Sequence, residues 1–197
     1  MFYDSFLAIE CTADEEILEH IHIPPRTVEN VFKVAPLFCH LVKRPQQLIT
    51  SMPDYYVARD MASRTIYICF RNILMIDIDD RDVDIGIFEK HSTKSFRIYK
   101  KKHSPGCHVF CTSEYMDHKN ESSLRFMIEN MCDFGYVIFS YIRGYSLRLN
   151  PKSTNDSRYY LDSIVRPEME LPEIVKMLDY CDNLTEKYSS CLFTFNF

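Results

Sequence analysis

The chain has 197 residues, of which 46% are hydrophobic and 14% aromatic, a composition that excludes a disordered protein. Its formal net charge of −5 argues against a dedicated duplex-DNA binder, so any nucleic-acid contact must use a local basic patch. No apolar run reaches the roughly 18 residues of a membrane span, and the first residues lack the basic stretch of a secretory signal. The 8 cysteines form no CxxC pair, which predicts free thiols in a reducing compartment, the cytoplasm or the nucleus.

Residues 1–60 are interrupted repeatedly by proline, which divides this stretch into short pieces. The spacing of apolar residues predicts one short helix over 14–21, capped by Thr12 or Asp14, and a second over 27–34. We therefore expect residues 1–60 to form an irregular N-terminal layer.

Residues 61–152 carry clearer signals and should form the core. The elements predicted there, in chain order, are two strands or one hairpin over 64–79, a short helix over 83–91 capped by Asp82, strands over 96–101 and 107–113 joined by a turn at 103–106, a helix from Asn120 or Ser122 to about Cys132, and strands over 136–141 and 145–149 joined at Gly144. This order predicts an α/β protein of the α+β kind, with a split βαβ or RRM-like arrangement. Its sheet should be mostly antiparallel, with the helices on one face.

Residues 153–197 are predicted to contain a strand over 159–165, a helix over 172–188 and a strand-like tail over 191–197. We expect this C-terminal extension to pack on the same core, so that the whole chain is a single domain.

Two acids, Asp77 and Asp79, end the hydrophobic strand predicted before residue 80. Side chains alternate along a strand, so both carboxylates should project to the same face. Two neighbouring carboxylates repel unless a cation lies between them, and Mg²⁺ or Mn²⁺ prefers such oxygen ligands. The alternative is a strand that enters a turn, with Asp79 and Asp80 capping the next helix.

His108 follows the predicted glycine turn, and basic residues flank it in the sequence. Alternation directs His108 away from Cys107 and Cys111, which argues against a zinc site. The residues that we consider able to hold phosphates are Ser104, Lys101, Arg148 and Lys152. The alternatives are a half-buried strand histidine and a solvated hairpin tip.

The pattern over residues 64–150 resembles the palm of the archaeo-eukaryotic primase superfamily. The features that carry the resemblance are a hydrophobic strand ending in Asp-x-Asp, a short helix, a hairpin, and a glycine turn followed by a histidine. The resemblance implies that Asp77 and Asp79 bind Mg²⁺ or Mn²⁺ and that His108 contacts the phosphates of an incoming nucleotide. It also implies a third acidic metal ligand on a later strand, for which Asp162 is the first candidate and Asp133 the second.

The chain departs from that family pattern at two points. Gly106 stands where the family has a serine, although Ser104 is near, and no third acid is marked by a motif. The family also includes members that have lost activity. Two functions therefore stay open. The first is metal-dependent nucleotidyl transfer by a primase-like enzyme acting on a nucleoside triphosphate and single-stranded nucleic acid. The second is a non-catalytic binding or structural module with the same fold and a protein partner; neither function involves a membrane.

Overall fold

The computed structural model describes residues 25–42, 46–61, 63–79, 83–101, 105–151 and 159–189. Within these ranges the chain forms two four-stranded sheets in which every strand pair is antiparallel. Sheet A contains, in spatial order, β1 (Gln46–Ser51), β2 (Tyr55–Asp60), β3 (Ile66–Phe70) and β7 (Tyr145–Arg148). Sheet B contains β4 (Met75–Ile78), β6 (Cys107–Cys111), β5 (Phe96–Lys101) and β8 (Tyr159–Val165). The mixed α+β class expected from the sequence is confirmed.

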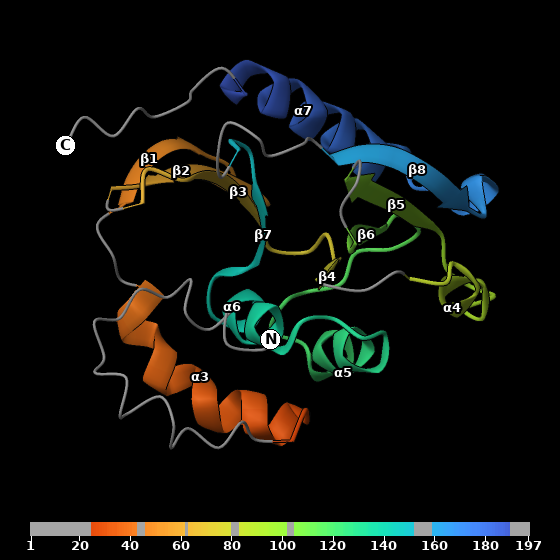
Figure 1. Cartoon of the computed structure of the whole chain (residues 1–197), viewed down its shortest axis with the longest axis horizontal. Coiled ribbons are helices and arrows are strands. Elements are labelled where there is room, and N and C mark those ends of the chain that lie inside the picture. Colours follow the sequence, from red (N-terminus) through yellow and green to blue (C-terminus); the bar gives the residue numbers. More distant parts are fainter. Residues whose placement is uncertain are drawn as a thin grey trace.

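Helices cover both faces of this pair of sheets. They are α3 (Val28–Val42), α4 (Gly86–Glu89), α5 (Glu121–Glu129), α6 (Phe134–Arg143) and α7 (Pro172–Tyr188), and the short 3-10 helix η1 (Pro167–Met169) precedes the last of them. Figure 1 shows α7 along one side of the sheets and α3, α5 and α6 along the other. The ring of Tyr180 in α7 lies 5.9 Å from that of Tyr55 in β2, so α7 reaches sheet A as well as sheet B.

The alternation of β5 decides which helices meet which face of sheet B. The ring of Phe96 lies 5.2 Å from that of Phe88 in α4 and 6.1 Å from that of Phe126 in α5. The two helices therefore share one face, as the sequence predicted. Arg97, the next residue, points to the opposite face and contacts Asp179 of α7.

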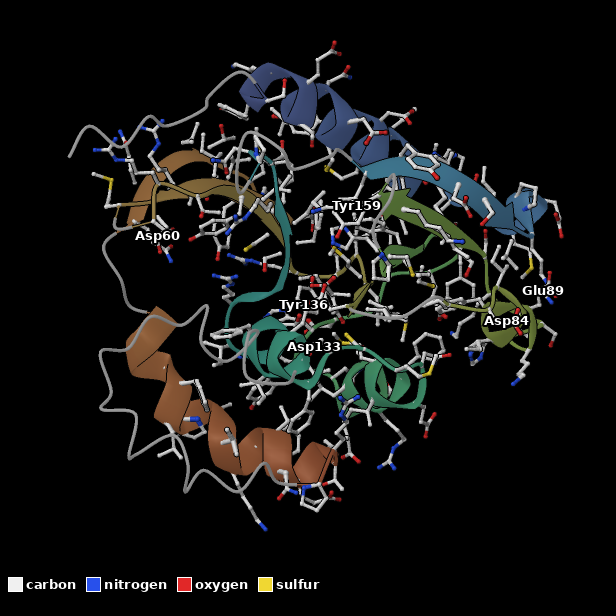
Figure 2. The ribbon with its side chains drawn as sticks, viewed as in Figure 1. Asp60, Asp84, Glu89, Asp133, Tyr136 and Tyr159 are labelled. Carbon is white, nitrogen blue, oxygen red and sulfur yellow. The ribbon has the colours of Figure 1, made fainter. Side chains whose placement is uncertain are left out.

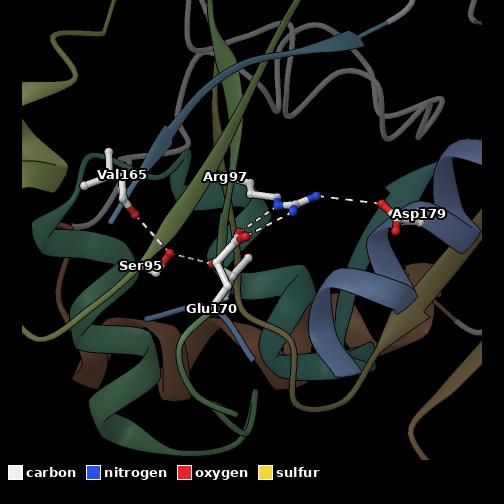
Figure 3. Close-up of polar contacts among 6 residues, drawn as sticks. Ser95, Arg97, Val165, Glu170 and Asp179 are labelled. Atoms are coloured by element: carbon white, nitrogen blue, oxygen red, sulfur yellow. Dashed lines mark hydrogen bonds and ion pairs between the residues drawn. The ribbon is translucent and has the colours of Figure 1, made fainter. Parts of the chain in front are cut away.

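Arg97 also anchors the segment that leads into α7 (Figure 3). Its Nε and Nη2 donate to the two carboxylate oxygens of Glu170, at 2.7 and 3.1 Å, and the two side chains are only 12% and 11% exposed. Beside it the Ser95 hydroxyl donates to the carbonyl of Val165 at 2.9 Å. These contacts hold β8 and the start of α7 against β5, and such a bidentate pair fixes orientation as well as distance.

One predicted element is wrong: residues 136–141 are helical and belong to α6. Its aromatic and β-branched residues suggested a strand. The buried residues Phe134, Val137 and Ile138 instead follow the spacing of a helix face. The helix begins after Asp133, whose carboxylate accepts the amide hydrogen of Tyr136, and it ends at Gly144.

The expectation of one sheet over residues 64–150 is also wrong. β3 and β7 belong to sheet A, whereas β4, β5 and β6 belong to sheet B, which β8 completes. In place of an irregular layer, residues 46–60 supply β1 and β2, and the predicted helix 27–34 is the first part of the longer α3. β1 is an edge strand whose residues are mostly exposed, so apolar and polar residues do not alternate along it. Its sequence therefore did not predict a strand.

The helix predicted over 83–91 is only the four-residue α4, Gly86–Glu89, and the helix predicted to about Cys132 ends at Glu129. The strand over 159–165 and the helix over 172–188 are found with those bounds. The helix predicted over 14–21, the tail 191–197 and the capping residue Asp82 lie outside the described residues. Among the helices that are described, none combines the length and the apolar character needed to cross a membrane.

Candidate functional site

Asp77 and His108 face each other across two neighbouring strands of sheet B. They are register partners on β4 and β6, and His108 Nε2 lies 3.3 Å from Asp77 Oδ1. Their neighbours on these strands are almost all apolar and buried, and the His108 side chain is itself only 11% exposed. Because directly opposed residues in an antiparallel pair share a face, this contact follows from the strand register itself. The structure thus brings together two of the three residues that the sequence placed at the site.

The His108 imidazole is covered by an aromatic ring on its other side. Tyr159, the first residue of β8, stacks on it with ring centroids 3.7 Å apart and an interplanar angle of 21°. The Lys101 ammonium lies 4.9 Å from the centre of the same tyrosine ring. A cation, an aromatic ring, an imidazole and a carboxylate therefore follow one another across sheet B; Figure 2 labels Tyr159 in this region.

Gly106 brings the start of β6 against the end of β4. It has a φ of +91°, and a Cβ at this position would lie 2.4 Å from the Ile78 carbonyl oxygen and 3.4 Å from the Asp79 Cα. Only glycine accepts both the left-handed backbone and the close approach without strain. Asp79, which is exposed, consequently lies beside the turn that leads to His108.

Asp133 precedes α6 and contacts the backbone of Asp77; Figure 2 labels Asp133 beside this helix. Its amide donates to the Asp77 carbonyl at 2.7 Å, which ties the start of α6 to β4. Burial is the main cause that raises the pKa of the Asp133 carboxyl, and the charge of Asp77 raises it further, although the Tyr136 amide opposes the shift. Of the two candidate third acids, Asp133 is therefore the one that contacts Asp77, although the described residues contain no group of three metal-binding side chains.

Two buried polar atoms at this contact have no hydrogen-bond partner among the described residues. They are His108 Nδ1 and Asp77 Oδ1, although Asp77 Oδ1 is in ion-pair contact with His108 Nε2. Burial also raises the pKa of the Tyr136 hydroxyl well above its usual value, with the charge of Asp77 as the second cause. Buried polar groups in proteins are nearly always satisfied, so these atoms indicate a place where water, an ion or a ligand completes the structure.

The other residues proposed from the sequence lie elsewhere or outside the described ranges. Asp162 pairs with Lys100 at 3.3 Å. Tyr99 is the partner of His108, and the next residue, Lys100, therefore points to the opposite face of the sheet. Arg148 is in sheet A, at the end of β7. Ser104 and Lys152 are not among the described residues.

The absence of disulfide bridges expected from the sequence is confirmed for the cysteines that the structure describes. Cys39, Cys69, Cys107, Cys111, Cys132 and Cys181 are all free. No group of three or more metal-binding side chains occurs among the described residues. Burial raises the pKa of the Cys107 thiol to about 12, which makes it a poor metal ligand and a poor nucleophile.

Two residues of this region were missed by the sequence reasoning, Tyr136 and Tyr159. Tyr136 was assigned to a strand, and Tyr159 reaches His108 through the pairing of β8 with β5, for which no local signal exists. Comparison of the chain with protein-family models, curated proteins and solved structures gave no match.

Proposed function

We propose that this protein binds a nucleoside triphosphate with a divalent metal ion at Asp77 and Asp79 and uses it for nucleotidyl transfer, as a primase-like enzyme does. The observation that carries the proposal is the pairing of Asp77 with His108 across β4 and β6, at 3.3 Å. It supports the proposal because the Asp77 carboxylate, a possible metal ligand, lies beside an imidazole that would contact phosphate in the arrangement that the resemblance implies.

The absence of a three-ligand metal group among the described residues is compatible with this chemistry. Mg²⁺ commonly takes only one or two protein carboxylates and completes its shell with water and substrate phosphates. In nucleotidyl transfer the metal would activate a 3′-hydroxyl and stabilise the leaving pyrophosphate. Apart from its 3.3 Å contact with His108 Nε2, Asp77 Oδ1 accepts no hydrogen bond among the described residues, which leaves a lone pair for such a metal ion.

His108 and Lys101 would act on the nucleotide phosphates in this proposal. Tyr159 lies between them, stacked on the imidazole and beneath the ammonium group. The stacking holds the imidazole in one orientation, and a fixed orientation lowers the entropic cost of each contact with the nucleotide.

The second candidate is a non-catalytic binding or structural module. The observation that favours it is the engagement of Asp162 with Lys100, which removes the first candidate for a third acid. Asp133 can fill that role, but its carboxylate already caps α6 through the Tyr136 amide at 3.0 Å.

A titration with Mn²⁺ in the presence of a nucleoside triphosphate tests the proposal. The wild-type chain should bind the metal, and the variant with both Asp77→Asn and Asp79→Asn should not. Asp84→Asn is the matched control, because the Asp84 carboxylate accepts the Gly86 amide at 3.0 Å and Asp84 lies away from Asp133 in Figure 2. Equal and negligible binding by wild type and double variant would favour the non-catalytic module.

Asp133→Asn then asks whether Asp133 is the third ligand. Asparagine caps a helix about as well as aspartate, so the helix start is preserved while the charge is removed. If Asp133 is a ligand, the affinity for Mn²⁺ should fall about tenfold or more. An unchanged affinity would leave the metal with two protein carboxylates.

A further inference from the structure

A half-buried arginine without a carboxylate partner lies at the far end of α6 from Asp77. Arg143 is the last residue of α6, and it forms no ion pair with an acid among the described residues. Its Nη2 donates to the Ser146 hydroxyl at 2.9 Å, while its Nε is buried and has no hydrogen-bond partner. Buried charges in folded proteins are normally paired, so this guanidinium indicates a place for an anion.

Two aromatic rings hold the Arg143 guanidinium. Its central carbon lies 5.0 Å from the centre of the Tyr67 ring and 5.6 Å from that of Phe139. The Tyr67 hydroxyl is buried, lacks a hydrogen-bond partner among the described residues, and has a pKa that burial raises to about 12. Two donor groups that lack acceptors thus meet at this point.

The strand register adds a second cation to the same face of sheet A. Arg148 on β7 is the partner of Tyr67 on β3, and one row further Ser146 is the partner of Cys69. The side chains of paired residues share a face, and Arg148 is exposed. Asp60, whose charge acts on the Tyr67 hydroxyl, accepts the Ser63 amide at the turn after β2.

We infer that Arg143, Tyr67 and Arg148 form a phosphate-binding site for a single-stranded nucleic acid, an inference that rests on the proposed function and names its second substrate. The guanidinium, phenol and hydroxyl groups match the contacts that proteins make to phosphate oxygens. Because the overall charge of the chain is −5, a nucleic acid would have to bind at a local basic site such as this one.

The length of α6 sets the distance between this site and the candidate metal site. Asp133, at the start of α6, is bonded to the Asp77 carbonyl, and Arg143 ends the helix. A helix of this length rises about 14 Å. A stacked strand rises about 3.4 Å per nucleotide, so roughly four nucleotides would connect the two sites. β7 then leaves the end of α6 and lies alongside β3 (Figure 1), which brings Arg148 to the same region.

Binding of a short fluorescein-labelled oligothymidylate, followed by anisotropy in EDTA without nucleotide, tests this inference. Arg143→Gln should weaken binding about tenfold, the loss expected for a charge-assisted hydrogen bond, and should reduce the slope of log K against log salt by about 0.7. Arg143→Lys should restore part of both. Arg125→Gln is the control of equal charge, because Arg125 is exposed on α5 and pairs with Glu121.

Arg148→Gln gives an independent test if Arg143→Gln does not fold, because Arg148 is exposed at the end of its strand. It should also weaken binding and lower the salt slope. Equal affinity and slope for wild type and both arginine variants would overturn the inference, as would a polyglutamate peptide that binds with the same dependence on Arg143. The variant with Asp77→Asn and Asp79→Asn should bind the oligonucleotide normally in EDTA, so loss of metal binding and loss of strand binding are separable.

Discussion

Gly106 lies against the backbone of Ile78 so closely that a Cβ on Gly106 would be 2.4 Å from the Ile78 carbonyl oxygen. Ile78 separates Asp77 from Asp79, so the turn before β6 is packed on the strand that carries both acids. The close contact couples the local backbone of Gly106 to the geometry of the candidate metal site.

Gly106→Ala should therefore destabilise the fold and weaken Mn²⁺ binding together. The left-handed backbone alone costs a non-glycine residue about 1–3 kcal/mol, and the close contact adds to this. Gly144→Ala is the matched control, since Gly144 has a φ of +102° and its Cβ would lie 2.5 Å from the Phe70 carbonyl oxygen in sheet A. Urea unfolding should show a loss of stability for both variants, whereas the metal titration should change only for Gly106→Ala. Normal metal binding by Gly106→Ala would separate the turn from the site.

Replacing both Asp77 and Asp79 by asparagine should change the free energy of unfolding by less than about 1 kcal/mol. Asp77 Oδ1 accepts no hydrogen bond, and the substitution removes the repulsion between neighbouring carboxylates. Chemical denaturation of the metal-free chain is the measurement. A loss of several kcal/mol would mean that the two acids maintain the fold, for instance through the contact of Asp77 with His108.

The shared face of Asp77 and His108 could be anticipated from the sequence because side chains alternate along a strand. Their contact also needs the pairing of β4 with β6, which joins distant parts of the chain. The helix over 172–188 was accessible, since Pro172 marks its first turn and buried Ile174, Leu178 and Cys181 follow a helical period. Strand alternation and helical periodicity are local features, in which each residue's position depends on neighbours a few residues away.

The features that the sequence did not reveal depend on long-range pairing. Tyr159 reaches His108 because the register of β5 and β8 shifts between Ile98 and Tyr99, so that Lys101 becomes the partner of Tyr159. A one-residue shift of this kind has no sequence pattern of its own. The helical state of residues 136–141 likewise depends on tertiary packing that overrides the strand preference of valine, isoleucine and tyrosine.

The buried pair of Arg97 and Glu170 should be a major contributor to stability when only one partner is removed. Glu170→Ala leaves a nearly buried guanidinium without its bidentate acceptor, since the contact to Asp179 is longer at 3.7 Å. The expected loss is about 3 kcal/mol. The double variant with Arg97→Met and Glu170→Leu should recover most of this loss, because no charge is left unpaired.

The pair of Arg125 and Glu121 provides the comparison for this prediction. Its Nη2 and Oε1 atoms are also 2.7 Å apart, but the two side chains are 56% and 58% exposed. Arg125→Ala should leave the unfolding transition unchanged within error, because solvent screens an exposed pair. Equal losses in the free energy of unfolding for Glu170→Ala and Arg125→Ala would show that burial of the pair of Arg97 and Glu170 does not increase its contribution to stability.

Tyr99 should make the fold sensitive to alkaline pH. Its side chain is buried against Phe110 at a ring distance of 5.6 Å, and burial, helped by the charge of Asp182, raises the pKa of its hydroxyl to about 12. The pKa in the unfolded chain is about 10. Below that value the hydroxyl is protonated in both states and pH has no effect through this group. Above it only the unfolded state releases the proton, so the free energy of unfolding should fall by about 1.4 kcal/mol per pH unit up to about pH 12.

Urea unfolding of wild type and Tyr99→Phe from about pH 9 to about pH 11 isolates this contribution. The phenylalanine ring keeps most of the packing but cannot ionise, so the variant should lose stability less steeply as the pH rises. Tyr115→Phe removes a hydroxyl from a side chain that is 51% exposed and should keep the wild-type slope. Parallel curves for wild type and Tyr99→Phe would show that the Tyr99 hydroxyl ionises at the same pH in the folded and unfolded chain, and would contradict its burial beneath α7.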